Sequence, residues 1–189
     1  MRVLLVDNYD SFTYNLAQLL TEAGCRHLDT LKNDKIDPDK MADYDKIVFS
    51  PGPGLPEEVP VMGDILSRFG KQKSILGVCL GHQAIGCFYG AQLQNLSQPV
   101  HGISSLLDIT DKGETLFNTL QGKIIVGRYH SWVIDPETLP LCLKVTSVAD
   151  DGCIMSVAHT DYDVKGIQFH PESYISLQGM VMMKNWLSK

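Results

Sequence analysis

A cysteine flanked by glycines is the residue best suited to chemistry in this sequence. Cys79 lies in Gly77-Val78-Cys79-Leu80-Gly81, after the apolar run Ser74–Val78 and before the helix-like stretch His82–Tyr89. The two glycines let the chain turn sharply from a strand into a helix and lift the central side chain above the sheet. Free N–H groups of the new helix would favour a thiolate and later an oxyanion. The pattern predicts a nucleophile, with a buried core cysteine as the alternative.

Two further segments follow strand-like runs and carry groups that a nucleophilic thiol needs. His170 stands two residues before Glu172, and the intervening proline favours an extended histidine. The carboxylate can therefore hold the imidazole that accepts the thiol proton. The loop Ser50–Pro56 contains three prolines and two glycines, and it can hold the N–H groups of Gly52 and Gly54 rigidly, as an oxyanion hole requires. A surface histidine and a stiff turn are the alternatives.

Other polar groups carry weaker signals. The run Arg128–Trp132 gathers polar and aromatic side chains and is a candidate pocket wall. Asp7 and Asp10 resemble an acidic phosphoacceptor pocket, but no lysine partner can be placed beside them, so capping of the first helix is preferred. No H-E-x-x-H or comparable ligand cluster is present, and we expect no metal site. Five widely spaced cysteines without a C-x-x-C pair indicate reduced thiols.

Composition sets the class of protein. The chain has 189 residues, 44% hydrophobic and 20% charged, which predicts one compact domain over residues 1–189. The formal net charge of -6 argues against a nucleic-acid backbone or an anionic membrane as the main partner. No run approaches the roughly 20 apolar residues that span a bilayer. The apolar stretch after Met1 ends at Asp7, too early for a signal peptide, so we expect a cytoplasmic protein.

The elements that must position these residues alternate in type along the first half. Expected strands, rich in β-branched residues, are Arg2–Val6, Lys46–Phe49, Ser74–Val78, Lys123–Val126, Leu143–Val148 and Lys165–Phe169. Expected helices are Ser11–Ala23, Val59–Phe69, His82–Tyr89 and Leu177–Leu187. The order predicts an α/β fold with an open, mostly parallel, flavodoxin-like sheet, helices on both faces, and antiparallel strands added between about Ala91 and Ala158. Ligands then bind beyond the carboxyl ends of the strands.

Four blocks of the sequence resemble the class I glutamine amidotransferases. Ser50–Gly54, Gly77–Gln83 and Gly166–Ser173 are similar to the three signatures of that family, in its order. The opening block Val6–Leu16 resembles one branch, the glutaminase components of anthranilate synthase and aminodeoxychorismate (para-aminobenzoate) synthase. The resemblance implies hydrolysis of L-glutamine to glutamate through a cysteine thioester. It also implies delivery of ammonia to a chorismate-binding synthase subunit, in a heterodimer or heterotetramer.

The resemblance also assigns roles. Cys79 is the nucleophile, His170 the general acid/base and Glu172 its orienting carboxylate. The backbone N–H groups of Gly52 and Leu80 form the oxyanion hole. Glutamine is held by Gly52, Pro53, Gly54, Gln83, Ser131 and Trp132. No cofactor is implied for this chain, and Mg²⁺ is expected only in the partner synthase subunit.

Three positions depart from the family pattern. Leucine is usual at Trp132, lysine at Ile103, and Ile-Leu-Thr at Tyr174–Ser176. These departures concern the glutamine pocket and the partner-facing surface. The main alternative function is a stand-alone Cys-His hydrolase of the same fold, such as a peptidase or γ-glutamyl hydrolase. A non-enzymatic flavodoxin-like binding module is the third, and it leaves the three signatures unexplained.

Overall fold

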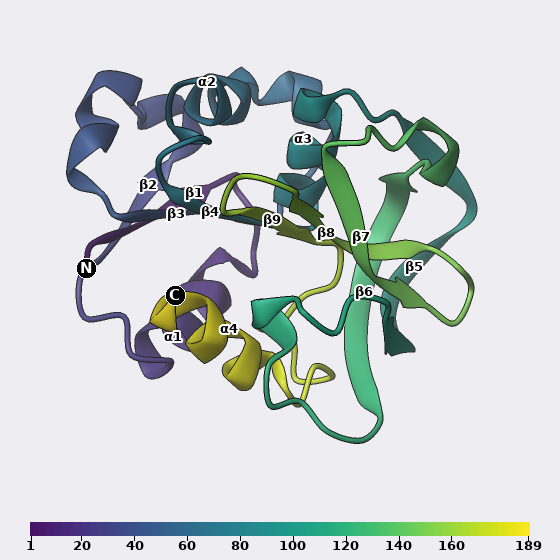
Figure 1. Cartoon of the computed structure of the whole chain (residues 1–189). Helices are drawn as coiled ribbons and strands as arrows, with labels where there is room; N and C mark the ends of the chain where they lie inside the picture. The colour runs from purple at the N-terminus through teal and green to yellow at the C-terminus, as the bar shows by residue number, and fades with distance from the viewer.

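The computed structural model describes residues 1–189 and contains one nine-stranded mixed sheet, ordered β2-β1-β3-β4-β9-β8-β7-β5-β6 (Figure 1). Its strands are β1 (Val3–Asp7), β2 (Leu28–Lys32), β3 (Lys46–Phe49), β4 (Ser74–Val78), β5 (Leu93–Ile109), β6 (Ile124–Ile134), β7 (Leu143–Ala149), β8 (Ile154–His159) and β9 (Val164–Ile167). The helices are α1 (Thr13–Glu22), α2 (Pro60–Phe69), α3 (Leu80–Tyr89) and α4 (Gly179–Ser188). Short 3-10 turns include η3 (Pro56–Glu58) and η4 (Thr115–Phe117).

The parallel part of the sheet is covered on both faces. Strands β2, β1, β3, β4 and β9 all pair in parallel. Val3 and Leu5 pack with α1 and α4, whereas Leu4 and Val6 pack with α2 and α3, and Figure 1 shows the two helix layers above and below the sheet. Burial on both faces explains why β1, β3 and β4 are almost continuously apolar in sequence. The predicted α/β architecture is confirmed.

The second half extends the sheet with antiparallel strands, as expected, but the strands are longer than the sequence indicated. β5 runs for 17 residues along β6, with register shifts between Asn95 and Val100 and between His101 and Ile103. Most side chains of β5 are exposed or half-buried, so it carries no apolar alternation. The edge strand β2 was missed for the same reason, because all five of its residues are only half-buried.

The first helix begins later than predicted. Its N-cap position is Phe12, and no side chain caps it. Asp10 lies two residues before Phe12, and its carboxylate accepts a hydrogen bond from the Phe12 N–H at 2.8 Å. The prediction that Asp10 caps the helix was therefore wrong. Gly24, at φ 115°, ends the helix, directly after the predicted last residue Ala23.

A buried ion pair connects the central strand β9 to the segment before η4. Lys165 Nζ lies 2.6 Å and 2.7 Å from the two carboxylate oxygens of Glu114. Both residues are buried, and Glu114 also accepts a hydrogen bond from the Leu116 N–H at 2.8 Å.

No helix of the protein combines the length and apolarity needed to cross a bilayer.

Candidate active site

The turn between β4 and α3 has the geometry predicted for a nucleophile elbow. Cys79 has φ 52° and ψ -101°, a strained backbone for a residue with a side chain. The backbone packs so closely around this turn that Gly77 and Gly81 leave no room for a side chain. A Cβ on Gly77 would lie 2.3 Å from the Gly81 carbonyl carbon, and one on Gly81 would lie 2.6 Å from Phe49 Cβ. Both flanking glycines are therefore required by shape, and the sharp strand-to-helix turn expected at Cys79 is present.

Neighbouring strand ends bring the other segments to this elbow. β9 pairs with β4, and the Cys79 N–H donates to the Ile167 carbonyl at 2.8 Å. On the other side, β3 pairs with β4 and ends at the Ser50–Gly54 loop. Beyond β9, the His170 N–H donates to the Gly127 carbonyl of β6 at 2.9 Å. The three segments singled out in the sequence therefore meet at one edge of the sheet.

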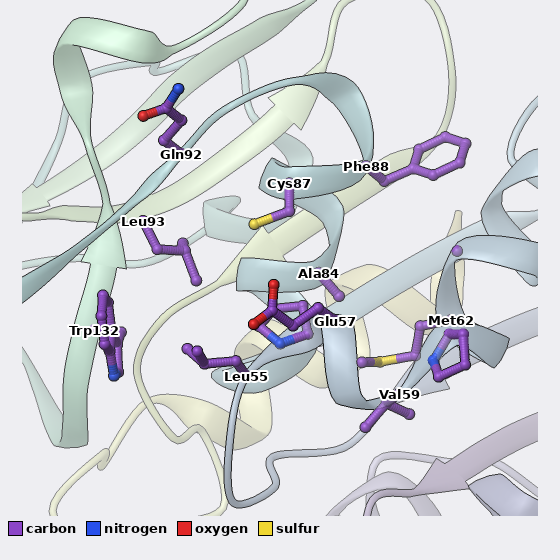
Figure 2. Close-up of a pocket in the computed structure, with 13 residues that line it drawn as sticks. Leu55, Glu57, Val59, Met62, Ala84, Cys87, Phe88, Gln92, Leu93 and Trp132 are labelled. Carbon is purple, nitrogen blue, oxygen red and sulfur yellow. The ribbon is translucent and has the colours of Figure 1, made fainter.

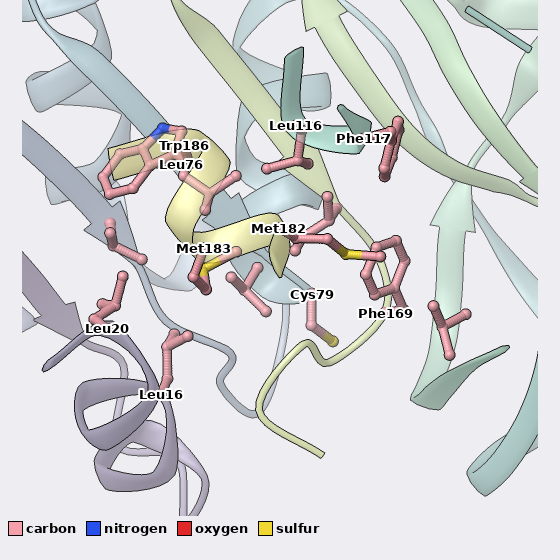
Figure 3. Close-up of a cluster of buried hydrophobic side chains, with 14 of the residues drawn as sticks. Leu16, Leu20, Leu76, Cys79, Leu116, Phe117, Phe169, Met182, Met183 and Trp186 are labelled. Atoms are coloured by element: carbon pink, nitrogen blue, oxygen red, sulfur yellow. The ribbon is translucent and has the colours of Figure 1, made fainter. Parts of the chain in front are cut away.

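The Cys79 side chain lies between a hydrophobic core cluster and a polar cavity. It is 6% exposed and borders the cluster that contains Phe169 and Met182, with its sulfur turned to the cluster edge (Figure 3). Sγ lies 3.9 Å from the Tyr129 carbonyl oxygen, to which a thiol donates, and 3.6 Å from Gln168 Nε2. The sulfur thus has one acceptor and one donor from the protein.

His170 and Glu172 form the pair that the sequence predicted. His170 Nδ1 lies 2.7 Å from Glu172 Oε1, and Nε2 has no hydrogen-bond partner. Burial lowers the pKa of His170, but the neighbouring Cys79 sulfur and the Glu172 carboxylate outweigh it and raise that pKa to about 10. The rings of Phe12 and Tyr129 pack on the imidazole at centroid distances of 5.5 Å and 4.9 Å. The histidine is held rigidly beside the thiol.

Two backbone donors are free beside the sulfur. The N–H groups of Gly52 and Leu80 make no hydrogen bond within the protein. A Cβ on Gly52 would lie 2.7 Å from Asn8 Cβ and 2.7 Å from Leu80 Cδ2, so the loop packs directly on the elbow. Asn8 fixes that loop, since its N–H donates to Ser50 Oγ and its Nδ2 to the Ser50 carbonyl, both at 2.9 Å. This pair of N–H groups is suited to bind an oxyanion.

A cavity of about 300 Å³ opens onto the sulfur. Its lining includes most of the residues predicted to bind substrate and comprises Gly52, Gly54, Leu55, Cys79, Gln83, Tyr129, His130, Ser131 and Trp132. Pro53 is exposed and does not line it. Gln83 Nε2 donates to the Trp132 carbonyl at 2.8 Å and to Gln168 Oε1 at 3.2 Å. The Gln83 oxygen is left to accept a hydrogen bond from a ligand.

The wall formed by β6 is held from behind by a buried polar chain. His130 Nδ1 donates to the Trp132 carbonyl at 3.1 Å, and His130 Nε2 accepts from Arg128 Nε at 3.1 Å. Arg128 in turn pairs with Asp151 at 2.7 Å. Burial lowers the pKa of His130 to about 4, and the Arg128 charge acts in the same direction. His130 is therefore neutral near pH 7 and acts as a fixed support.

A larger cavity of about 490 Å³ lies alongside, between the η3–α2 segment and α3 (Figure 2). Leu55 and Trp132 line both cavities and separate them. The larger one is mostly apolar and does not include Cys79, so the smaller cavity is the candidate reaction site. No group of three histidine, cysteine or acidic side chains is arranged to hold a metal ion.

Comparison with known proteins identifies the family. The sequence profile described as "Glutamine amidotransferase class-I" matches residues 4–189. The chain belongs to the class I glutamine amidotransferases. It is 40% identical over 187 residues to the Aminodeoxychorismate/anthranilate synthase component 2 of Bacillus subtilis (strain 168), covering 98% of this chain and 95% of that protein. It is 41% identical over 192 residues to the Aminodeoxychorismate synthase component 2 of Escherichia coli (strain K12), covering 99% and 100%.

Solved structures agree with the fold. The crystal structure of a candidate GMP synthase subunit from Thermoplasma acidophilum superposes with a TM-score of 0.88 at 23% identity. The match covers 100% of this chain and 92% of that one. The predicted flavodoxin-like arrangement with additional antiparallel strands is therefore that of a class I glutamine amidotransferase domain.

The departures from the amidotransferase pattern leave the reacting groups in place. The Trp132 carbonyl, not its side chain, holds Gln83, so this contact does not depend on the side chain. Ser176 keeps a hydroxyl where threonine is usual, and that hydroxyl donates to the His170 carbonyl at 2.6 Å. Ile103 and Tyr174 are 49% and 86% exposed and change only the outer surface.

Sequence reasoning missed several polar residues of this amidotransferase site. Gln168 contacts the sulfur, Asn8 anchors the Ser50–Gly54 loop, and Arg128 with Asp151 supports His130. The signal for Gln168 was its place directly after β9, two residues before His170. The lysine that could not be placed beside Asp7 is Lys32 of β2, at 2.6 Å.

Proposed function

We propose that this amidotransferase is the glutaminase component of a chorismate-using synthase that makes anthranilate or aminodeoxychorismate. The observation that carries the proposal is the reaction centre: a strained cysteine, a buried His170–Glu172 pair and two unbonded N–H groups surround one small polar cavity. The relatives over nearly the whole chain are named as component 2 of such synthases, which supports the choice of acceptor.

The groups of the cavity supply each step of glutamine hydrolysis. The Cys79 thiolate attacks the carboxamide carbon of glutamine, and the developing oxyanion binds the N–H groups of Gly52 and Leu80. His170 donates its Nε2 proton to the departing ammonia, while Glu172 holds Nδ1. Water then attacks the γ-glutamyl thioester, with His170 as base, and glutamate leaves. Because these groups complete the reaction, no cofactor is needed in this chain, and any Mg²⁺ belongs to the synthase component.

Substrate orientation follows from the hydrogen-bond pattern of the pocket wall. Both hydrogens of Gln83 Nε2 are used by the Trp132 carbonyl and Gln168. Gln83 therefore offers only its oxygen, which suits the ammonium group of an amino acid. The Ser131–Trp132 backbone and the Gly52–Gly54 loop close the cavity around the rest of the ligand.

The partner synthase is proposed to dock on the edge that carries the site. Exposed aromatic residues gather there: Tyr9 and Tyr14 are 54% and 67% exposed, and Tyr174 is 86% exposed. The same turn places Phe12 on the rings of Tyr129 and His170, at centroid distances of 5.2 Å and 5.5 Å. Docking at this edge would shelter ammonia from solvent, where protonation would end its use as a nucleophile.

Docking can also act on the reaction rate. Asn8 links the Asp7–Phe12 turn to Ser50, and through it to the Gly52 donor. A typical allosteric coupling of about 1–3 kcal/mol, roughly 5–150-fold, is enough to make docking visible as rate. We therefore expect weak glutaminase activity from the isolated chain and a rise of at least about tenfold, mostly in kcat, when synthase and chorismate bind.

The test is reconstitution with the chorismate-binding component from the same cell. Glutamate release and the product formed from chorismate are measured together, for the wild type and for Cys79→Ser. The wild-type complex is expected to use glutamine, and the Cys79→Ser complex to use only free ammonia at raised pH. An isolated chain that already runs at the rate of the complex would overturn the proposal and favour the stand-alone hydrolase.

A further inference from the structure

Gln168 is a buried polar residue to which the reaction described above gives no role. It follows β9 directly and is fully buried. Its backbone N–H donates to the Met155 carbonyl of β8 at 2.8 Å, so its position is fixed by the sheet. Its side-chain amide spans the site, with Nε2 at 3.6 Å from Cys79 Sγ and Oε1 at 3.2 Å from Gln83 Nε2.

We propose that Gln168 is a further catalytic residue, whose amide N–H stabilises the Cys79 thiolate while its oxygen holds Gln83 in the orientation that receives glutamine. The inference rests on the proposed glutaminase function. The Gln168 amide thereby contacts both the nucleophile Cys79 and the substrate-binding side chain of Gln83.

The orientation of this amide is determined by its neighbours. Gln83 Nε2 already donates to the Trp132 carbonyl at 2.8 Å, so it faces Gln168 as a second donor and must meet an oxygen. The Gln168 nitrogen is thereby turned toward the sulfur. A planar amide can serve both partners at once because it carries a donor and an acceptor on the same carbon.

The Gln168 N–H stabilises the thiolate form of Cys79 relative to the thiol. A thiol donates weakly to the Tyr129 carbonyl at 3.9 Å, whereas a thiolate has no hydrogen to give and gains from an N–H donor. The Gln168 N–H therefore offsets the carbonyl oxygen that faces the sulfur from β6. Without it, the thiolate would keep only His170 and the free backbone N–H groups at the start of α3.

The titratable groups around the sulfur come from three elements. His170 and Glu172 lie beyond β9, Tyr129 and His130 belong to β6, and His82 lies in α3. Burial lowers the pKa of His82 to about 3 and that of His130 to about 4, so both are neutral near pH 7. Arg128, behind His130, is paired with Asp151 at 2.7 Å, which leaves His170 as the cation that faces the sulfur. A change of Gln168 is then read against a constant background of charge.

The experiment measures alkylation of Cys79 by iodoacetamide as a function of pH in the isolated full chain, with peptide mapping to separate Cys79 from the other four cysteines. Gln168→Met keeps the size and removes the donor. We expect its midpoint for thiolate formation to rise by about one pH unit, and alkylation at pH 7 to slow by roughly tenfold, the effect of one hydrogen bond to a charged group. Gln168→Glu keeps the shape and places a carboxylate at the sulfur, so its midpoint should rise further.

Two controls keep the result interpretable. Gln178→Met removes an amide that bonds only the exposed Gln121 carbonyl and should leave the midpoint unchanged. Gln83→Met should raise KM for glutamine more than it moves the midpoint. A folded Gln168→Met or Gln168→Glu chain with the wild-type midpoint would overturn the proposal. Failure of the glutaminase function itself would appear differently: Gln168→Met would shift the midpoint relative to the wild type, yet the wild-type chain would release no glutamate with its partner.

Discussion

Substitution of Gly52 by alanine is the sharpest test of the oxyanion hole. A Cβ at this position would lie 2.7 Å from both Asn8 Cβ and Leu80 Cδ2, and 2.9 Å from the Asn8 carbonyl oxygen. These distances are about 1 Å shorter than ordinary carbon contacts of roughly 3.5–4.0 Å. The contacts lie on the elbow and on the residue that anchors the loop. The loop must therefore move away from the elbow, and the Gly52 N–H moves with it.

The expected loss follows from that displacement. Removing one oxyanion donor costs about 10²–10³ in kcat, roughly 2.7–4 kcal/mol. We expect Gly52→Ala to lower kcat for glutamine hydrolysis by about 100-fold or more in the reconstituted complex. Synthesis from free ammonia should be unchanged, because the acceptor chemistry takes place on the partner.

Gly63→Ala is the matched control. Gly63 lies inside α2, and a Cβ there would meet only Phe88 Cδ2, at 4.0 Å. It should leave kcat unchanged and raise the free energy of unfolding by about 0.5–1 kcal/mol, since alanine favours a helix over glycine. A Gly52→Ala protein that unfolds cooperatively and keeps wild-type kcat would refute the assignment of the Gly52 N–H as a donor.

Three further predictions concern the catalytic pair, a buried ion pair and a buried histidine. His170→Ala should lower kcat by about 10³–10⁴-fold, and Glu172→Ala by a smaller factor because the imidazole keeps its proton-transfer chemistry. Steady-state glutamate release measures both losses. A larger loss for Glu172→Ala than for His170→Ala would mean that the base is misassigned. Lys165→Met should cost about 3–5 kcal/mol in urea unfolding by leaving Glu114 buried and unpaired, with much of the loss recovered in the Glu114→Leu/Lys165→Met double variant. Burial holds the pKa of His82 at about 3, so the unfolded chain binds one more proton at acid pH. The free energy of unfolding should then fall by about 1.4 kcal/mol per pH unit from about pH 6.5 toward pH 3, and urea unfolding of His82→Gln should lack that part of the slope.

The fold could be predicted where a strand is buried on both faces. β1, β3 and β4 are fully or almost fully buried, and their apolar runs show this in the sequence alone. The edge strand β2 and the long β5 could not be found in that way. Their side chains are largely exposed or half-buried, so their pairing depends on the neighbouring strand and leaves no local pattern.

The same distinction separates the site residues. The elbow at Cys79 needs glycines because of contacts within a few residues, so its motif is local and readable. Gln168 meets Cys79 across 89 positions of the chain, and Asn8 meets Ser50 across 42. A buried glutamine or asparagine looks like a surface residue until the strands that carry it are paired. Only the tertiary structure turns these residues into parts of the site.

The most direct test of the central claim is to locate the covalent intermediate. The reconstituted complex is mixed with isotopically labelled glutamine, quenched in acid during the first turnovers, digested and mapped by mass spectrometry. A γ-glutamyl group on the peptide that contains Cys79, absent from a Cys79→Ser complex, is the result expected from the elbow and its two N–H donors. Label on Cys87 or Cys153, or glutamate release without a covalent adduct on any cysteine, would contradict it.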